Sequence, residues 1–489
     1  MIIDVSVARS RYGEICAVSA LTLLGFTFHY LSLTRTPFAN GWDSYFYLLQ
    51  IKSWFENGHL VSSRISVFYP VLIAFKWLTG NYILGVKVMT AFSAALVIPL
   101  SFWLVSSITK QKIPGLVTAL LTLCSPHLFY FASQYPKNLV GYVFLLSMLI
   151  FLVKQKYLPA ILFVILSLLA HKLTGAMALA ALFLFIGHQI IFRHKKHKLL
   201  LWGLIPVGAL LCIPKIFALH DFERQLGIFT AVPQSFAFMF FREFEGLLTL
   251  LWKIEIVAAT LATAALAIML LTRKATSYRL WVIPVLFLLL NFPFLRWDMN
   301  GFSFRFFLLA VLFGSSVCGI AVSLFPRLQK GALICTLLLA PAVLFTYKSY
   351  DPGLHDPPYA KYSLITDRLA SSEVFSQAQL FIAHKGLAEY IKFTTDKDAM
   401  SWIPEYEMPP NTLWRVVAGV RPFRLRSFIL PDTVYELGFD YSVVPETNWQ
   451  LFLKDVQDNH SDFHDDYTTW MNPSRVRPVF LQKFRRKDD

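Results

Sequence analysis

The sequence predicts a polytopic α-helical membrane protein with about eleven transmembrane helices and a polar C-terminal domain of about 140 residues. Of its 489 residues, 56% are hydrophobic and only 15% are charged, whereas soluble domains carry about 25% charged residues. Several apolar runs reach the ~18 residues that suggest a membrane span. Charged residues gather in short clusters between these runs, but from residue 351 onward they mix with short apolar stretches.

The long apolar runs, taken in chain order, locate the expected spans. The first run has no convincing small-residue cleavage site, so it is interpreted as a retained anchor rather than a signal peptide. The expected spans are 15–34, 81–108, 113–131, 138–153, 157–173, 175–192, 198–219, 248–272, 280–295, 304–325 and 330–347.

Short basic clusters alternate with more acidic loops along the chain. The positive-inside rule places such clusters on the cytoplasmic side. If the N-terminus is cytoplasmic, all six clusters share one side and the C-terminal domain is extracytoplasmic. We therefore expect a multi-pass cell (inner or plasma) membrane protein whose net charge of +15 serves topology rather than nucleic-acid binding. The clusters are Arg9 and Arg11; Lys110 and Lys112; Lys154 and Lys156; Arg193, Lys195, Lys196 and Lys198; Arg273, Lys274 and Arg279; and Arg327 with Lys330.

The first outer loop, residues 35–80, is expected to hold two helices that lie on the membrane. Residues 43–57 carry a polar face and many aromatic side chains, and Gly58 ends this helix. Residues 65–79 are apolar but short, and Lys76 interrupts them. If they spanned, every later basic loop would move to the outside, so an interfacial or re-entrant position is favoured.

After a transmembrane module of residues 1–350, residues 351–489 are expected to form a small α/β or α+β domain. The domain starts with a linker that has three prolines in eight residues. Its expected elements are a strand followed by a helix in 378–393 and short strands at 414–420 and 440–445.

The most informative local motif is Gly41-Trp42-Asp43-Ser44-Tyr45-Phe46-Tyr47, which directly follows the first span. A carboxylate at this position can act as a general base at the membrane face. Asp is also strongly favoured as a helix N-cap. The local sequence leaves both roles for Asp43 open.

The layout as a whole resembles the GT-C superfamily of polytopic membrane glycosyltransferases. The shared features are a cytoplasmic N-terminus, Asp43 in a long first outer loop, two interfacial helices, Tyr69-Pro70 before the second span, many further spans and an outer C-terminal domain. The resemblance covers about residues 10–350, and the protein O-mannosyltransferase and aminoarabinose transferase branches are the most similar. It implies a GT-C-like fold and the transfer of a sugar from a polyprenyl-phosphate-linked donor to a glycan, lipid or protein acceptor.

By position, Asp43 resembles the catalytic acid that GT-C enzymes carry in the first outer loop. One carboxylate suffices to accept the acceptor's proton, because the carrier phosphate is already a good leaving group. The phosphate needs positive charge as it departs. The cationic candidates for binding the substrate phosphate are Arg305, Lys172 and His171, with Arg296 as a further cation. Tyr69 is a further candidate for substrate binding.

Each cation also has a structural alternative. Arg296, Arg305 and Lys172 can reach lipid head groups or pair with Asp298. His171 can be a satisfied interface histidine. Lys87, inside the second span, is expected to face protein or a cavity.

Two features depart from the family pattern. Residues 133–138 of the second outer loop contain no acid, and Gln134 and Lys137 occupy it instead. Ser44 follows Asp43 where several branches have Glu. With few carboxylates near Asp43, we expect no metal ion and no cofactor.

Two other function classes remain as alternatives. One is a polysaccharide polymerase or ligase, although such a protein is expected to carry its large loop between late spans. The other is a lipid-linked glycan transporter or flippase without catalytic activity. Transporters usually show repeats and polar breaks at mid-membrane, whereas the polar residues recognised here gather at the outer boundary.

Overall fold

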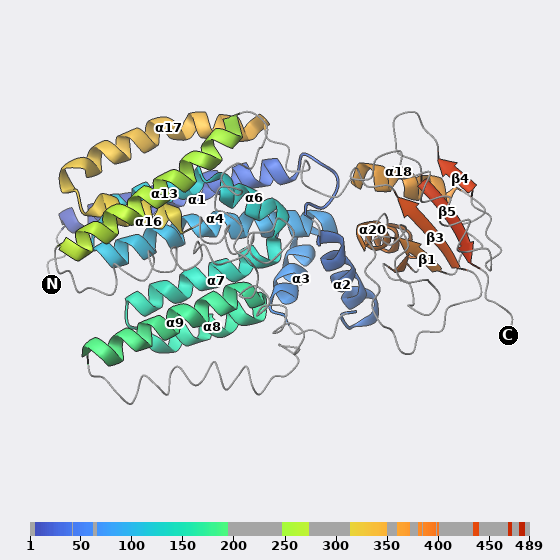
Figure 1. Ribbon diagram of the computed structural model, residues 1–489, viewed down its shortest axis with the longest axis horizontal. Coiled ribbons are helices and arrows are strands. Elements are labelled where there is room, and N and C mark those ends of the chain that lie inside the picture. The colour runs from blue at the N-terminus through green and yellow to red at the C-terminus, as the bar shows by residue number, and fades with distance from the viewer. Residues whose placement is uncertain are drawn as a thin grey trace. The chain divides into compact units, whose positions relative to one another are not determined.

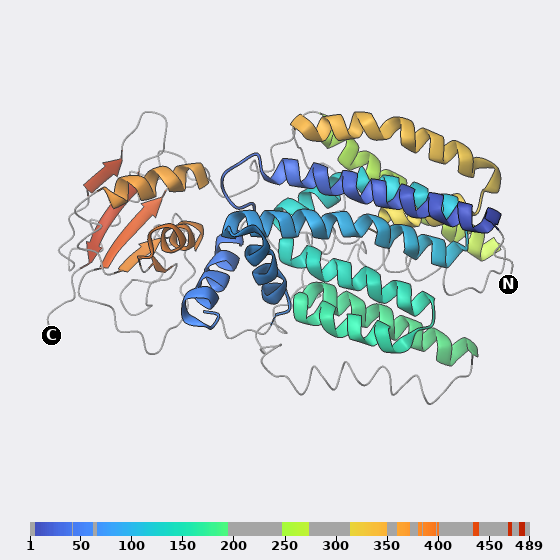
Figure 2. The same cartoon turned by 180° about the vertical axis from the view of Figure 1, so that it is seen from behind.

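The structure is a computed structural model. It describes residues 5–41, 43–61, 66–193, 247–272, 313–349, 359–371, 380–383, 385–397, 399–400, 434–439, 468–471 and 479–484. The chain divides into two units (Figures 1 and 2). The first comprises residues 1–41 and 62–354 and is called the helical unit. The second comprises residues 42–61 and 355–489 and is called the mixed unit.

The helical unit is built around α4. This helix packs against α1, α3, α5 and α7, and α8 and α9 continue the layer beyond α7 (Figure 1). In the most apolar stretch of α4, 72% of the residues are buried, against 22% in α1, so α4 is central and α1 is peripheral. The helices are α1 (Val5–Leu33), α3 (Phe68–Thr79), α4 (Tyr82–Thr109), α5 (Lys112–Leu123), α6 (Pro126–Gln134), α7 (Pro136–Val153), α8 (Tyr157–Ala170), α9 (Lys172–Arg193), α13 (Leu247–Thr272), α16 (Gly314–Ser323) and α17 (Gln329–Ser349), with the 3₁₀ turn η1 (Pro326–Leu328).

The third expected span, 113–131, is broken into α5 and α6, which meet at 52°. The Ser125 side chain accepts a hydrogen bond from the Leu128 backbone, and Pro126 occupies the first helical position. A serine N-cap followed by proline starts a new helix. The helix is therefore interrupted at this point, and α5 with α6 forms either one broken span or a re-entrant loop.

The structure confirms a polytopic membrane fold. Four described helices are long and apolar enough to cross a membrane, or up to six if each bent pair is one span; the second pair, α16 with α17, bends by 112°. Shorter apolar helices include α3, α8 and α9. The expected spans 198–219 and 280–295, and residues 304–312 of the span 304–325, lie outside the described residues, so the count of eleven stays a prediction.

The mixed unit contains a five-stranded sheet and three described helices. Strand order is β2-β1-β3-β5-β4, with β1 parallel to β2 and β3, and β5 antiparallel to β3 and β4. The expected strand and helix in 378–393 are confirmed as β1 and α20. The expected strands at 414–420 and 440–445 lie outside the described residues. The elements are α2 (Ser44–Asn57), α18 (Tyr359–Ala370), β1 (Leu380–Ala383), α20 (Lys385–Thr395), β2 (Ala399–Met400), β3 (Val434–Phe439), β4 (Thr468–Met471) and β5 (Val479–Phe484).

Helix α2 joins the mixed unit although it lies about 300 residues earlier in the chain. Tyr45 is 1% exposed. Lys52 forms an ion pair with Asp396 and donates a hydrogen bond of 3.0 Å to the Phe393 carbonyl. The ring of Tyr45 lies 4.8 Å from that of Tyr359, 4.9 Å from Tyr390 and 5.4 Å from Phe393, measured between centroids.

Candidate functional site

Asp43 occupies the N-cap position of α2 but does not act as a side-chain cap. Its backbone carbonyl accepts the first helical hydrogen bond, from the Tyr47 N–H at 3.1 Å. Its carboxylate makes no capping hydrogen bond, and its φ and ψ of −104° and 6° differ from the usual extended N-cap geometry. The start of α2 therefore does not depend on this half-buried carboxylate for a cap.

Gly41, two residues before Asp43, fits a position that only glycine tolerates. Its φ is +89°, and an added Cβ would lie 2.9 Å from the carbonyl oxygens of Ser133 and Gln134 at the end of α6. Both constraints come from backbone atoms, which cannot rotate away. The chain that leads into Asp43 is thus fixed against α6.

Tyr69 and Lys137 come together at one corner of the helical unit. Tyr69 lies in the first turn of α3 and is 2% exposed. The Lys137 ammonium, in the first turn of α7, lies 5.1 Å from the centroid of the Tyr69 ring. This is cation–π geometry. Sequence reasoning treated Lys137 only as a departure from the family pattern and did not expect it beside Tyr69.

The segment that carries His171 and Lys172 is attached to the same corner. Ser66, three residues before Tyr69, donates a hydrogen bond of 3.2 Å to the carbonyl of Ala170 at the end of α8. The Leu173 N–H donates to His171 Nδ1 at 3.2 Å, so His171 stabilises the start of α9. Because Nδ1 accepts, a neutral His171 carries its proton on Nε2. Lys172 is half-buried as the first residue of α9.

Lys87 of α4 is buried and donates a hydrogen bond to the Thr36 carbonyl. The expectation that Lys87 faces protein is confirmed, and its ammonium fixes the loop between α1 and Gly41. Arg305, Arg296 and Asp298 lie outside the described residues, so their expected roles stay predictions.

A buried polar cluster at the break between α5 and α6 was missed by sequence reasoning. The Glu255 carboxylate, from α13, accepts a hydrogen bond of 2.7 Å from the Ser125 hydroxyl and pairs with His127 Nδ1 at 2.6 Å. His127 is fully buried and stacks on Trp252 with 3.5 Å between ring centroids. The available signal was a lone acid inside an apolar span, which is a functional-site hypothesis by default.

This cluster and Gly41 lie at opposite ends of α6. Both Glu255 oxygens are engaged, which suits an anchor better than a proton acceptor. The cluster attaches the first turn of α6 to α13. The last carbonyls of α6 leave no space for a side chain at Gly41. Within the described ranges, no three His, Cys, Asp or Glu side chains gather to hold a metal ion.

Comparisons with known proteins identify the fold. No protein-family model matches the sequence, and no curated protein matches it either. Among solved structures, ArnT from Cupriavidus metallidurans bound to undecaprenyl phosphate is similar with a TM-score of 0.62 and 11% identity, over 96% of this chain and 98% of that one. The same ArnT in the apo state gives a TM-score of 0.57 at 11% identity, over 97% and 98% of the two chains.

A third similar structure is the arabinofuranosyltransferase AftD from Mycobacteria. Its TM-score is 0.52 at 12% identity, over 98% of this chain and 40% of that chain. At such identities the likeness concerns the fold. The resemblance to the GT-C superfamily, expected from the sequence, is confirmed at that level: this chain has the fold of ArnT along nearly its whole length.

Proposed function

We propose that this protein is a glycosyltransferase that moves a sugar from a polyprenyl-phosphate-linked donor to an acceptor hydroxyl on the non-cytoplasmic face of the membrane. The observation that carries the proposal is the similarity of fold to ArnT over 96% of this chain. That ArnT structure was determined with undecaprenyl phosphate bound. Asp43 supports it, because the carboxylate that follows the first span is not used as a helix cap.

In this mechanism Asp43 is the general base. The acceptor oxygen attacks the anomeric carbon and passes its proton to the Asp43 carboxylate. The bond between the anomeric carbon and the phosphate oxygen breaks, and the carrier phosphate leaves with the electron pair. No separate acid is needed, since the phosphate departs as a stable anion.

Cations of the helical unit stabilise the departing phosphate in this proposal. Lys172 and Arg305 supply full charges. His171 contributes a hydrogen bond through Nε2–H, because its Nδ1 is engaged by α9. Tyr69 positions the Lys137 ammonium, which lies over its ring. Lys137 therefore supplies a positive charge where other GT-C branches have an acid.

The proposed topology has eleven spans, a cytoplasmic N-terminus and an extracytoplasmic C-terminal domain. The grouping of basic residues supports it. Helices α4 and α7 end directly before Lys110 and Lys154, and Lys112 at the start of α5 pairs with Glu14 near the start of α1. These basic residues lie at one end of the helical unit. The positive-inside rule expects such residues to lie on one side of the membrane, the cytoplasmic side.

The test is the turnover of purified Asp43→Asn in liposomes that contain a polyprenyl-phosphate-linked sugar. Asparagine keeps the size and polarity of the side chain but cannot take a proton, so we expect turnover to fall roughly 10²- to 10⁴-fold. Carrier binding, measured on the same preparation, should be unchanged. Glu56→Gln is the matched control, because Glu56 is an exposed acid near the other end of α2. Near-normal turnover in Asp43→Asn would refute the general-base role.

A further inference from the structure

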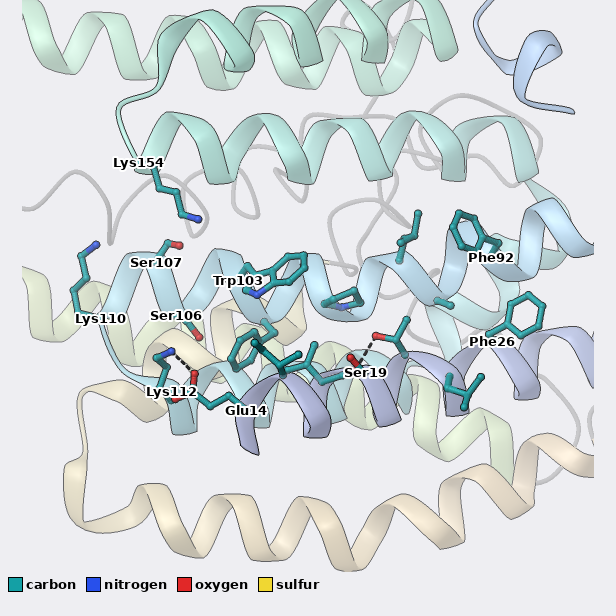
Figure 3. Close-up of a pocket in the computed structure, with 18 residues that line it drawn as sticks. Glu14, Ser19, Phe26, Phe92, Trp103, Ser106, Ser107, Lys110, Lys112 and Lys154 are labelled. Carbon is teal, nitrogen blue, oxygen red and sulfur yellow. Dashed lines mark hydrogen bonds and ion pairs between the residues drawn. The ribbon is translucent and has the colours of Figure 1, made fainter. Parts of the chain in front are cut away.

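The helical unit has a large groove along α1 and α4 that the proposed reaction does not use (Figure 3). Its volume is about 910 Å³. The walls are mostly apolar and include Val18 and Phe26 of α1 and Phe92 and Trp103 of α4. Phe92 and Trp103 keep 43% and 49% of their surfaces exposed, although both lie in a span. The groove therefore opens toward the membrane rather than into the protein core.

One end of the groove is strongly basic. Lys110, Lys112 and Lys154 line this end, and Figure 3 shows them clustered there with Glu14, far from Phe92. Glu14 forms an ion pair with Lys112. Among the described residues, no ion pair includes Lys110 or Lys154, and both side chains are exposed. The end of the groove thus keeps two positive charges.

We propose that this groove binds an anionic phospholipid of the leaflet on the lysine side. One acyl chain lies along the apolar walls, and Lys110 and Lys154 hold the phosphate. The distance along α4 from Phe92 to Lys110 is ~27 Å, which exceeds the ~15 Å depth of one leaflet's hydrocarbon. A full acyl chain therefore fits without leaving the groove.

The charge pattern favours a lipid over a protein partner. Lys110 directly follows the last turn of α4 and Lys154 the last turn of α7, where lipid phosphates lie. Close packing of a partner helix needs an uninterrupted row of small residues, but the rings of Phe26, Phe92 and Trp103 stand among the small residues that line the groove. Trp103 lies between the lysines and Phe92 in Figure 3, so its indole would contact the bound chain.

This site is separate from the corner that holds Tyr69. Helix α3 packs against the first turns of α4, where the Cα of Lys76 approaches Gly85. The lysine end of the groove follows the last turn of the same helix, ~40 Å away along its axis. The phospholipid is thus an occupant of the opposite membrane face, independent of the proposed donor.

Trp103 provides the measurement. The protein is reconstituted in phosphatidylcholine vesicles, and brominated phosphatidylglycerol or brominated phosphatidylcholine quenches its fluorescence. The difference between the wild-type protein and Trp103→Phe isolates the Trp103 signal. A lysine near the headgroups contributes about 1 kcal/mol to the binding of an anionic lipid. We therefore expect brominated phosphatidylglycerol to bind at this position at least roughly fivefold more strongly than brominated phosphatidylcholine.

The double variant Lys110→Gln, Lys154→Gln should lose that preference. Lys156→Gln is the matched control, because Lys156 is exposed two residues from Lys154 but does not line the groove. If the double variant does not fold, salt provides a second test: the wild-type preference should decrease at 1 M salt, where screening shortens to about 3 Å.

Three outcomes would overturn the proposal. Equal quenching by both lipids would mean an ordinary lipid-facing surface. A preference that survives the double substitution would mean that these lysines do not hold the phosphate. Stronger displacement of the brominated lipid by polyprenyl phosphate than by unbrominated phosphatidylglycerol would mean that the groove takes the carrier instead.

Discussion

Helices α2 and α3 come from the same expected loop, yet they belong to different units. Both are short and rich in aromatic residues, and both end at a glycine in the left-handed region, Gly58 with φ of 73° and Gly80 with φ of 69°. Helix α2 packs on α20 of the mixed unit. Helix α3 packs on α4 and is joined to the end of α8 by the Val67 N–H, which donates to the Leu169 carbonyl at 3.2 Å.

The difference shows that one loop serves two structural purposes. Asp43 opens α2, so residues at the far end of the chain help to fix the helix that follows the proposed base. Gly41, just before it, is held by α6 of the helical unit. Residues of α18 and α20 therefore stabilise the segment that begins with Asp43.

The largest expected effect comes from removing the α2 anchor. Tyr45→Ala deletes a ring that is 1% exposed and contacts three other rings. Truncating a buried aromatic residue costs about 3–5 kcal/mol. Hydrogen exchange should show faster exchange in α2 and α20, with α3 unchanged. Tyr45→Phe keeps the ring and should change exchange little; equal acceleration in α3 would contradict the division of the loop.

The opposite pattern is expected from Gly85→Ala. An added Cβ at Gly85 would lie 2.8 Å from the Cα and 2.9 Å from the N of Lys76, so α3 must move away from α4. Overpacking of this kind costs about 1–3 kcal/mol. Exchange should accelerate in α3 and leave α2 unchanged. Gly187→Ala is the control, because no atom of the described residues lies within 4 Å of its added Cβ, and it should not accelerate exchange in α3.

Local sequence predicted the two helices but not their partners. Apolar length and Gly58 were sufficient to locate α2. The hydrogen bond from Lys52 to the Phe393 carbonyl joins residues that are 341 positions apart. The local pattern of apolar and polar residues gives no information about such a contact. The pairing of Glu255 with His127 was missed for the same reason, since the two residues are 128 positions apart.

The candidate site was predictable only where a single residue carries the signal. Asp43 was identified from its place after the first span, but only the structure shows that its carboxylate does not cap α2. The serine and proline at Ser125-Pro126 are a sequence signal for the start of a new helix. The long apolar run around them suggested a continuous span instead. Lys137 was noted as an exception to a pattern, although its contact with Tyr69 depends on how α3 meets α7.

The smallest expected effects come from the lysines of the two helices. Lys52 of α2 pairs with Asp396, and Lys76 of α3 lies 4.8 Å from the centroid of the Tyr82 ring. Each lysine therefore contacts its own unit. Asp396 is 75% exposed, and exposed ion pairs contribute about 0–1 kcal/mol. Lys52→Met should cost slightly more than Asp396→Asn, because it also removes the hydrogen bond to the Phe393 carbonyl.

A double-mutant cycle of Lys52→Met with Asp396→Asn, read by thermal unfolding in detergent, isolates the ion pair. The coupling energy should stay below about 1 kcal/mol. Lys76→Met is the matched change in α3 and should cost about 0.5–1 kcal/mol through its lost cation–π contact. Coupling of more than about 2 kcal/mol between Lys52 and Asp396 would show that the ion pair, rather than the aromatic cluster around Tyr45, holds α2 to the C-terminal residues. In that case Tyr45→Ala should accelerate exchange in α2 less than Lys52→Met does.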